Sequence, residues 1–314
     1  MSTSITVRAP AKINLSLLVG TATAGGFHTL ATIYQAIGLW EQVTVVEQQH
    51  WSIHLRGPHA GDDIPVDETN LAWCAGVALQ RHHGVTGTAA RIEIHKGVPV
   101  AGGMAGGSAD AAATLVALDR LWDLGTPDAD LLRIAARLGS DVPFALVGGT
   151  AAGTGRGELV SPLEDRGTWW WVAVPSDQGL STPAVYREFD VVAAEANAAP
   201  ELWSPAYPED PDVSAEVVRA LTTGDPRTRG ACLRNDLEEP ALRLRPDLNR
   251  TFTVAREVGA VRAMLSGSGP TVLLLADDAA HAQAMHSSLS LRGVPSYVAP
   301  GPVAGAHVVD GPVV

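Results

Sequence analysis

Polar and apolar residues alternate along residues 12–17, near the start of the chain. Successive side chains of a β-strand point to opposite faces, so Lys12, Asn14 and Ser16 would share one face and the apolar residues between them the other. The pattern therefore predicts a strand with one buried face. It also places Lys12 and Asn14 where both can point into one cleft, although a polar edge facing solvent would alternate in the same way.

Short apolar or alternating runs predict the remaining strands, at residues 43–46, 91–95, 169–174, 263–266, 271–276 and 294–298. Apolar residues at helical spacing predict helices at 69–83, 111–122, 126–138, 213–221 and 279–291. Helices and strands are mixed in both halves, which indicates an α+β protein with two domains, residues 1–167 and 168–314. Residues 193–211, rich in Ala, Pro and Glu, predict a surface insertion, and the Gly- and Pro-rich tail from residue 300 predicts a loose end.

The composition excludes several classes of protein. A chain of 314 residues that is 46% hydrophobic can bury a sizeable core. The formal charge of -12 argues against binding to a nucleic-acid polymer, which needs clustered Lys and Arg. The two cysteines, Cys74 and Cys232, predict no disulfide framework or zinc site. No signal peptide or bilayer-spanning run is visible, so we expect a cytoplasmic protein that does not enter a membrane. We also expect a monomer or a weak homodimer.

Lysine is almost absent. The chain has 22 Lys+Arg, of which only Lys12 and Lys96 are lysines, leaving 22 − 2 = 20 arginines. Such a bias is typical of a GC-rich genome that has replaced lysine wherever a generic positive charge suffices. The two remaining lysines are candidates for positions that need a compact ammonium group. For Lys96, chance retention explains the residue equally well.

A run of small residues precedes the predicted helix at 111–122. Glycine and alanine let the backbone turn tightly and direct several N–H groups to one point, and the free N–H groups of a following helix add to them. This arrangement binds phosphate without a basic side chain. The run is neither a Walker A loop nor a dinucleotide fingerprint, and a glycine-rich turn that only allows close helix packing is the alternative. The candidate phosphate-binding residues in this run are Pro99, Val100, Ala101, Gly102, Gly103, Met104, Ala105, Gly106, Gly107 and Ser108.

Three segments, in order along most of the chain, resemble the motifs of the GHMP kinases, the family of galactokinase, homoserine kinase, mevalonate kinase and phosphomevalonate kinase. They are residues 9–15, 99–112 and 266–270. The resemblance implies transfer of the γ-phosphoryl group of ATP to a small-molecule alcohol, with Mg²⁺. It also implies a two-domain fold, with an N-terminal domain like ribosomal protein S5 and a ferredoxin-like C-terminal domain.

Within this family, residues 12–15, 26–30 and 138–143 resemble one branch, whose substrate is a cytidine diphosphate-linked methylerythritol. The resemblance implies phosphorylation of its 2-hydroxyl group. Five positions depart from the branch: Ala101, Ala105, Ala109 and Asp110 stand where Gly, Gly, Ser and Asn are frequent, and Phe27 stands where Tyr is common. The departures put in doubt any loop side chain as a magnesium ligand, so we assign no residue as a ligand of the metal.

Asp141 follows a predicted helix end and precedes a Val-Pro pair. A kinase that acts on an alcohol needs a group to accept the hydroxyl proton, and a carboxylate within hydrogen-bond reach can do so. By itself the sequence favours an N-cap aspartate. The resemblance implies instead that Asp141 is the catalytic base and that Lys12 stabilises its charge and the developing negative charge.

The resemblance also implies a cytidine site around His28, which would recognise the cytosine ring. Phe27 and Tyr186 are the candidates to stack on that base, because aromatic faces favour ring contacts. A satisfied surface histidine and, for the tyrosines, a core position are the alternatives. The other residues predicted to contact the substrate are Asn14, Tyr34, Thr182, Gly267, Ser268 and Gly269.

On the ATP side, the resemblance implies adenine contacts from Lys96 and a base or ribose contact from Asn70. Asn70 is explained equally well as a polar residue that opens a helix. Residues 235–236 resemble a family string to which we assign no role at this point. Two other functions remain open: a GHMP kinase for a mevalonate- or homoserine-type alcohol, and a non-catalytic nucleotide-binding regulator.

Overall fold

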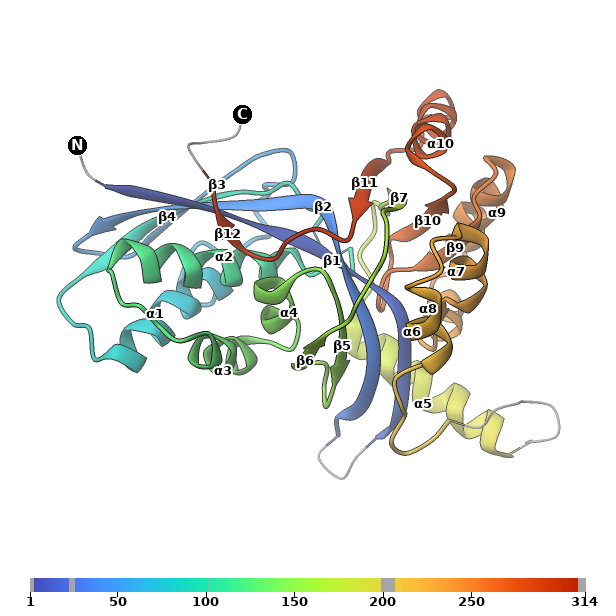
Figure 1. The fold of residues 1–314 in the computed structure, drawn as a ribbon, viewed down its shortest axis with the longest axis horizontal. Helices are drawn as coiled ribbons and strands as arrows, with labels where there is room; N and C mark the ends of the chain where they lie inside the picture. Colours follow the sequence, from blue (N-terminus) through green and yellow to red (C-terminus); the bar gives the residue numbers. More distant parts are fainter. Residues whose placement is uncertain (1–2, 23–25, 101, 199–206, 310–314) are drawn as a thin grey trace.

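Two long antiparallel strands, β1 (Ser4–Ala22) and β2 (His28–Gln48), extend through both halves of the molecule. The computed structural model describes residues 3–22, 26–100, 102–198 and 207–309. The register of the β1–β2 pair shifts between Pro10 and Ala11 and again between Asn14 and Ser16. Such irregularities bend a strand pair, and the long ribbon is visibly curved in Figure 1. The predicted strand at 12–17 is the central part of β1.

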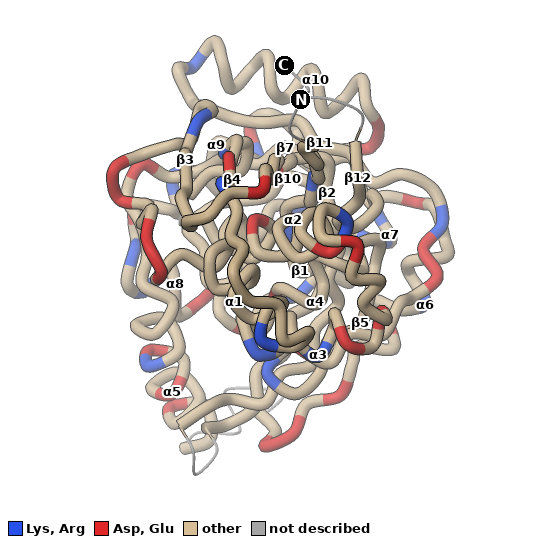
Figure 2. Tube along the Cα trace, turned by 90° about the vertical axis from the view of Figure 1, so that its left-hand side faces the viewer, with Lys and Arg blue, Asp and Glu red and all other residues tan. Residues whose placement is uncertain are grey.

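The first sheet has the order β12-β1-β2-β4-β3; in addition β5 pairs with β2, β6 pairs with β5, and β8 lies parallel to β1. Basic and acidic residues are interspersed along the chain in Figure 2. The further strands of this sheet are β3 (Ser52–Arg56), β4 (Ala89–His95), β5 (Thr150–Thr154), β6 (Leu159–Pro162), β8 (Arg234–Asn235) and β12 (His307–Val308).

Helices cover one side of this sheet (Figure 1). The central helix, α2, presents mainly alanines to the core, and these small side chains allow it to lie close to β1 and β2. It begins five residues before the predicted position, so that the end of the glycine-rich run is itself the first helical turn. The helices of this layer are α1 (Leu71–His83), α2 (Gly106–Leu121), α3 (Asp128–Leu138) and α4 (Val142–Val147).

The second sheet has the order β11-β7-β10-β9 and is buried on both faces. Along β7 (Trp169–Val174), Trp169 and Trp171 pack toward β1 and β2, while Val172 and Val174 pack toward the helices on the other face. The remaining elements here are β9 (Arg262–Leu265), β10 (Val272–Ala276), β11 (Tyr297–Gly301), α5 (Thr182–Ala198), α6 (Ala215–Ala220), α7 (Pro226–Cys232), α8 (Glu238–Leu244), α9 (Leu248–Glu257) and α10 (Ala279–Leu291).

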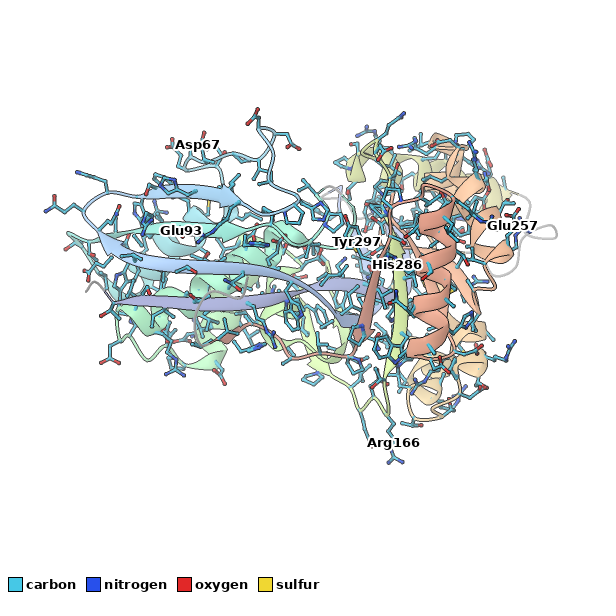
Figure 3. All side chains as sticks on the ribbon, turned by 90° about the horizontal axis from the view of Figure 1, so that it is seen from above. Asp67, Glu93, Arg166, Glu257, His286 and Tyr297 are labelled. Atoms are coloured by element: carbon cyan, nitrogen blue, oxygen red, sulfur yellow. The ribbon has the colours of Figure 1, made fainter. Side chains whose placement is uncertain are left out.

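The two halves meet along the long strands. Seen from above, Tyr297 at the start of β11 lies at this junction, with His286 of α10 on the outer side (Figure 3). The Tyr297 ring packs edge-on against His59, which follows β3 in the first half, with 5.4 Å between ring centroids. Residues of β1 belong to the hydrophobic cores of both halves, so this strand extends in space from one half into the other. The domain boundary at residue 167 stays a prediction.

The expectation of a loose tail is wrong for residues 300–309. Gly301 ends β11, and β12 then pairs with β1 through Val7 and Arg8, so that the chain returns to the first sheet. The expected surface insertion at 193–211 is wrong at its start, where Ala193 and Ala196 are buried residues of α5; residues 199–206 and 310–314 lie outside the described part of the chain. No helix within the described ranges combines the length and apolar character needed to cross a membrane.

Candidate active site

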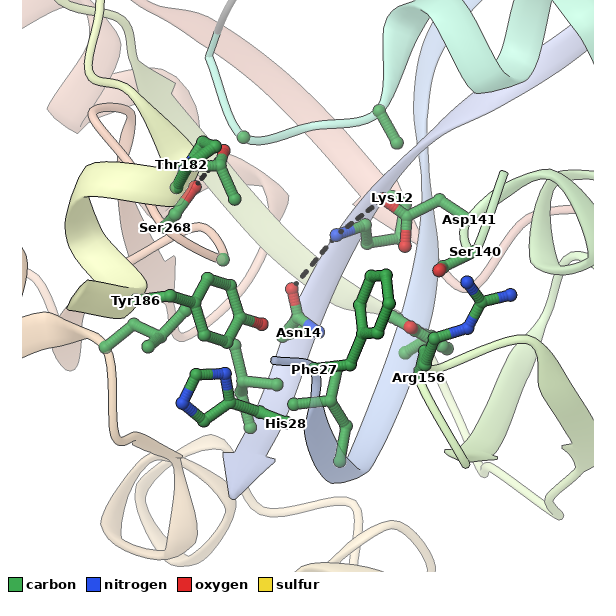
Figure 4. Close-up of a pocket in the computed structure, with 18 of the residues that line it drawn as sticks. Lys12, Asn14, Phe27, His28, Ser140, Asp141, Arg156, Thr182, Tyr186 and Ser268 are labelled. Carbon is green, nitrogen blue, oxygen red and sulfur yellow. Dashed lines mark hydrogen bonds and ion pairs between the residues drawn. The ribbon is translucent and has the colours of Figure 1, made fainter. Parts of the chain in front are cut away.

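A cavity of about 660 Å³ lies between the glycine-rich loop, β1, the start of α5 and the turn between β9 and β10. It is lined by residues from all of these segments (Figure 4). Twelve of these residues belong to the predicted catalytic pair, substrate site and glycine-rich loop. The predicted residues that line the cavity are Lys12, Asn14, Phe27, His28, Tyr34, Gly103, Ala105, Asp141, Thr182, Tyr186, Gly267 and Ser268.

Lys12 and Asp141 form an ion pair in this cavity. Lys12 Nζ lies 3.3 Å from Asp141 Oδ2, and the Asp141 side chain is 30% exposed against 9% for Lys12. Asp141 occupies the N-cap position of α4, as the sequence by itself favoured, but its side chain makes no capping hydrogen bond. The carboxylate is therefore held by a cation and still open to the cavity.

A chain of hydrogen bonds orients Asn14 toward Lys12. The Asn14 amide nitrogen donates to Thr32 Oγ1 at 2.7 Å, and the Thr32 hydroxyl donates to the carbonyl of Ser16 at 2.6 Å. Because the amide nitrogen is used in this way, Oδ1 of Asn14 faces Lys12 and accepts from Nζ at 3.2 Å. Lys12 Nζ thus lies between Asn14 Oδ1 and Asp141 Oδ2. Lys12 and Asn14 share the polar face of β1, as the alternation predicted.

Tyr34 of β2 lies against the Lys12–Asp141 pair. Its ring centroid is 5.4 Å from Lys12 Nζ, and it packs on Phe144 of α4 at 4.9 Å. Burial, the charge of Asp141 and a hydrogen bond with that carboxylate hold the pKa of Tyr34 well above its ordinary value. Tyr34 is therefore a neutral phenol at any physiological pH, both a core residue and a wall of the cavity.

The glycine-rich loop turns sharply before α2. Gly103 and Ala105 both have positive φ, 73° and 58°, and Ala105 precedes the helix without a side-chain cap. The first N–H groups of α2 therefore have no capping side chain, and the helix begins beside the cavity. A Cβ on Gly103 would lie 2.2 Å from the carbonyl oxygen of Ser266, so only glycine fits here.

Apart from Gly103 and Ala105, no described residue of the predicted phosphate loop lines the cavity. Gly106, Gly107 and Ser108 form the first turn of α2, Val100 is exposed, and Ala101 lies outside the described residues. Met104 is buried in the core between the sheets, although its carbonyl accepts from the backbone N–H of Lys12 at 3.0 Å. The remaining predicted loop residues are Pro99 and Gly102, of which neither lines the cavity.

The structure does not bring Lys96 or Asn70 to the cavity. Asn70 caps α1, with Oδ1 accepting from the N–H of Ala72 at 2.9 Å and Nδ2 donating to the carbonyl of Pro65 at 2.7 Å. Lys96 is buried between two carboxylates beneath α2. Their predicted contacts with ATP stay predictions.

The turn at residues 266–270 closes the cavity from the second half. Gly267 has φ 56°, and a Cβ there would lie 3.7 Å from Lys12 Nζ and 3.4 Å from Asn14 Oδ1. Ser268 Oγ lies 2.8 Å from the hydroxyl of Thr182. Gly269 does not line the cavity, but its N–H donates to the carbonyl of Ser266 and shapes the turn.

Asn235 supports this turn, a role that the sequence did not reveal. Its amide nitrogen donates to the carbonyls of Leu265 and Gly267, at 3.0 and 2.7 Å, and its Oδ1 accepts from the N–H of Leu237. The next residue, Asp236, accepts from the N–H of Val19 in β1 at 3.0 Å. Residues 235–236 therefore connect β1 to the glycine turn.

Aromatic rings and a carboxylate surround His28 at the other end of the cavity. His28 Nε2 lies 2.8 Å from Asp190 Oδ1, and the imidazole packs against Tyr186 with 5.0 Å between centroids. Phe27 is 60% exposed, and the guanidinium of Arg156 lies 5.5 Å from its ring. His28 is therefore paired rather than simply exposed to solvent.

Four polar residues of the cavity were not predicted: Ser140, Arg156, Arg187 and Asp190. Asp190 was accessible to sequence reasoning, because it lies one helical turn after Tyr186 and so shares its face of α5. Ser140 adjoins the predicted base. Arg156 stands in a glycine-containing turn between β5 and β6, and nothing in the local pattern distinguishes it from a surface residue.

Comparison with known proteins defines the class. Residues 70–149 match the GHMP kinases N terminal domain, and residues 217–294 match the GHMP kinases C terminal domain. The chain belongs to the GHMP kinase family, and the predicted family and α+β fold class are confirmed.

The relatives are more specific. The 4-diphosphocytidyl-2-C-methyl-D-erythritol kinase of Nocardioides sp. is 51% identical, over 97% of this chain and 99% of its own. The protein of the same name from Mycobacterium tuberculosis is 45% identical, over 98% and 94%. A crystal structure of 4-(cytidine 5'-diphospho)-2C-methyl-D-erythritol kinase is 29% identical with a TM-score of 0.73, over 96% of this chain and 100% of that one. The L. major mevalonate kinase, 16% identical with a TM-score of 0.75 over 97% and 100%, shares the fold.

Proposed function

We propose that this chain transfers the γ-phosphoryl group of ATP to the 2-hydroxyl of 4-diphosphocytidyl-2-C-methyl-D-erythritol, a step toward isoprenoid precursors by the non-mevalonate route. Relatives with this name match nearly the whole chain at 45–51% identity. The observation that carries the proposal is one cavity that holds the Lys12–Asp141 pair, the end of the glycine-rich loop and the aromatic pocket around His28.

In the proposed reaction, Asp141 accepts the proton of the 2-hydroxyl group as its oxygen attacks the γ-phosphorus. The bond between the γ-phosphorus and the β–γ bridging oxygen breaks, and ADP leaves with that electron pair. Lys12, held by Asn14 beside Asp141, pairs with the carboxylate and offsets the negative charge that develops on the transferred group. The free N–H groups at the start of α2 bind the phosphates.

The cytidine end of the substrate lies against His28, between Phe27 and Tyr186. Aromatic faces on two sides of a slot favour a flat heterocycle. Asp190 accepts a hydrogen bond from Nε2 of His28 and so directs the other ring nitrogen, Nδ1, to a different partner. The roles of these residues follow from their place in the cavity and from the family resemblance.

Mg²⁺, when bound with ATP, neutralises phosphate charge. Mg²⁺ commonly binds through substrate phosphates together with one or two carboxylates, and we assign none of the carboxylates of this chain to it. We also propose the cytoplasm as the location and a monomer or weak homodimer as the state of the protein.

An ADP-release assay with a panel of alcohols tests the proposal. The purified protein is given ATP, Mg²⁺ and either 4-diphosphocytidyl-2-C-methyl-D-erythritol, mevalonate or homoserine. We expect turnover with the cytidine-linked substrate and competition by CDP, because the pocket around His28 would hold the cytidine part of both. Turnover with mevalonate or homoserine alone would assign another branch of the family, and absence of turnover with every alcohol would favour a non-catalytic regulator.

A further inference from the structure

A buried cluster of three charged side chains lies beneath the first turn of α2, outside the cavity. Lys96 Nζ is 2.6 Å from Asp110 Oδ2 and 2.7 Å from Glu41 Oε1. The exposed fractions of the three side chains are 4%, 5% and 0%. Burial of ionised groups costs free energy unless they are paired. A cluster of three such groups therefore indicates a specific role.

The position of the cluster supplies that reason. Lys96 directly precedes the glycine-rich loop, and Asp110 lies in the second turn of α2, directly after it. The Lys96–Asp110 contact therefore joins the two ends of the loop across its base. Glu41 of β2 adds a third point, because its Oε2 accepts from the N–H of Gly97, the first loop residue, at 3.0 Å.

Lys96 is itself firmly held. Its backbone N–H donates to the carbonyl of Arg56 at 2.7 Å, and its carbonyl accepts from the N–H of His59 at 3.2 Å. On the other side, a Cβ on Gly106 would lie 2.7 Å from Glu41 Oε1 and 3.6 Å from Lys96 Nζ, so the start of α2 rests on the cluster. The anchor on the sheet is rigid, and the helix contacts it closely.

We propose that Lys96, Asp110 and Glu41 form a staple that positions the phosphate-binding loop, and that Lys96 acts on the nucleotide through this loop rather than by contact with the adenine. The inference rests on the proposed use of ATP. With the staple intact, the N–H groups of the loop and of α2 are ordered before the nucleotide arrives; without it, binding must order them.

The charge state of the cluster agrees with this role. Burial and the neighbouring Asp110 raise the pKa of Glu41 to about 8, against the opposing effect of Lys96. Burial also raises the pKa of Asp110, while Lys96 lowers it, so the two carboxyls share one cation and Lys96 bridges them across the base of the loop. The second oxygen of Asp110 has no hydrogen-bond partner among the described residues, so Lys96 is the group that compensates this carboxylate.

The two roles for Lys96 predict different nucleotide selectivity. A contact with the adenine ring would discriminate ATP from GTP, and its loss would reduce that discrimination. A staple acts on the loop that binds the phosphates, and ATP and GTP carry the same phosphates. Loss of the staple therefore weakens the binding of both nucleotides by the same factor. Rescue by a conservative variant gives a second distinction, because an amide oxygen at position 110 can still accept from Lys96.

Calorimetric titration of the protein with a non-hydrolysable ATP analogue and with the matching GTP analogue, without alcohol, tests the staple. We expect Asp110→Ala to raise both dissociation constants about tenfold, equivalent to ~1.4 kcal/mol, with their ratio unchanged within about twofold. Asp110→Asn is expected to restore both to within about threefold of wild type. The matched control is Asp165→Ala, which removes a buried carboxylate beside Arg229 in the other half and should lower thermal stability without changing either constant.

If Asp110→Ala does not fold, the double variant Lys96→Met with Asp110→Leu tests the proposal instead. It removes both members of the Lys96–Asp110 ion pair, so neither is left as an unpaired buried charge. It too should weaken both analogues equally. Unchanged affinity in these variants would overturn the staple, and a changed ATP-to-GTP ratio would assign Lys96 to direct base contact instead. A wild-type protein that binds neither analogue would refute the proposed kinase activity, a result distinct from either of these.

Discussion

Replacement of Lys12 by arginine tests the catalytic pair while keeping the charge. Lys12 Nζ contacts Asp141 through one carboxylate oxygen, at 3.3 Å, and shares its protons with Asn14 Oδ1 at 3.2 Å. This long, single contact leaves the carboxylate able to accept a hydroxyl proton. A guanidinium is planar and wider, and it binds a carboxylate through two parallel hydrogen bonds.

The size of the effect follows from that second contact. A hydrogen bond to a charged group contributes ~1.5–3 kcal/mol, and the reaction would have to break it to free the carboxylate. We therefore expect Lys12→Arg to lower turnover by about tenfold to a hundredfold. Stability should change little, by roughly 0.5 kcal/mol, because the side-chain end faces the cavity and the positive charge is kept.

Steady-state kinetics beside a thermal melt measure the two effects separately. Wild-type turnover in Lys12→Arg would refute the reasoning, because it would mean that the ammonium does not act on Asp141 during the reaction. A loss of turnover with a large fall in melting temperature would also count against it, since the nearby backbone of Gly267 would then have been displaced by simple overcrowding.

Three further predictions follow from the same geometry. Asp141→Asn should lower turnover by about 10² to 10⁴ with little change in ATP affinity, because the change removes the base and keeps the shape; activity within a few-fold of wild type would exclude Asp141 as base. Gly103→Val should weaken ATP binding far more than CDP binding in calorimetry, since its Cβ would meet the carbonyl of Ser266, and equal losses would indicate misfolding. Burial and Asp110 raise the pKa of Glu41 from 4.5 to about 8, so the folded protein keeps a proton that the unfolded chain loses, and this contribution to stability falls as pH rises through that window. Glu41→Gln should therefore flatten urea-measured stability between pH 4.5 and 8, and an unchanged slope would contradict the assignment.

Sequence reasoning identified the parts of the site that depend on local pattern. The alternation at residues 12–17 placed Lys12 and Asn14 on one strand face, and β1 confirms that they contact each other. The glycine-rich run was located because positive φ and a close backbone approach restrict the residue type, as at Gly103. The three motifs together also identified the family, because their order extends over most of the chain.

Pairings between distant segments required the tertiary structure. The sequence alone favoured Asp141 as a helix cap, and only the fold shows its side chain paired with Lys12 of β1. It offered no way to know that Lys96 faces Glu41 and Asp110, or that Asp190 pairs with His28. The tail that reads as loose is held by pairing between β12 and β1. Local backbone preferences depend on residues that are close in the sequence, so they can be predicted from its pattern. The partner of a charged side chain depends on which distant segments pack beside it, and that is determined only when the chain has folded.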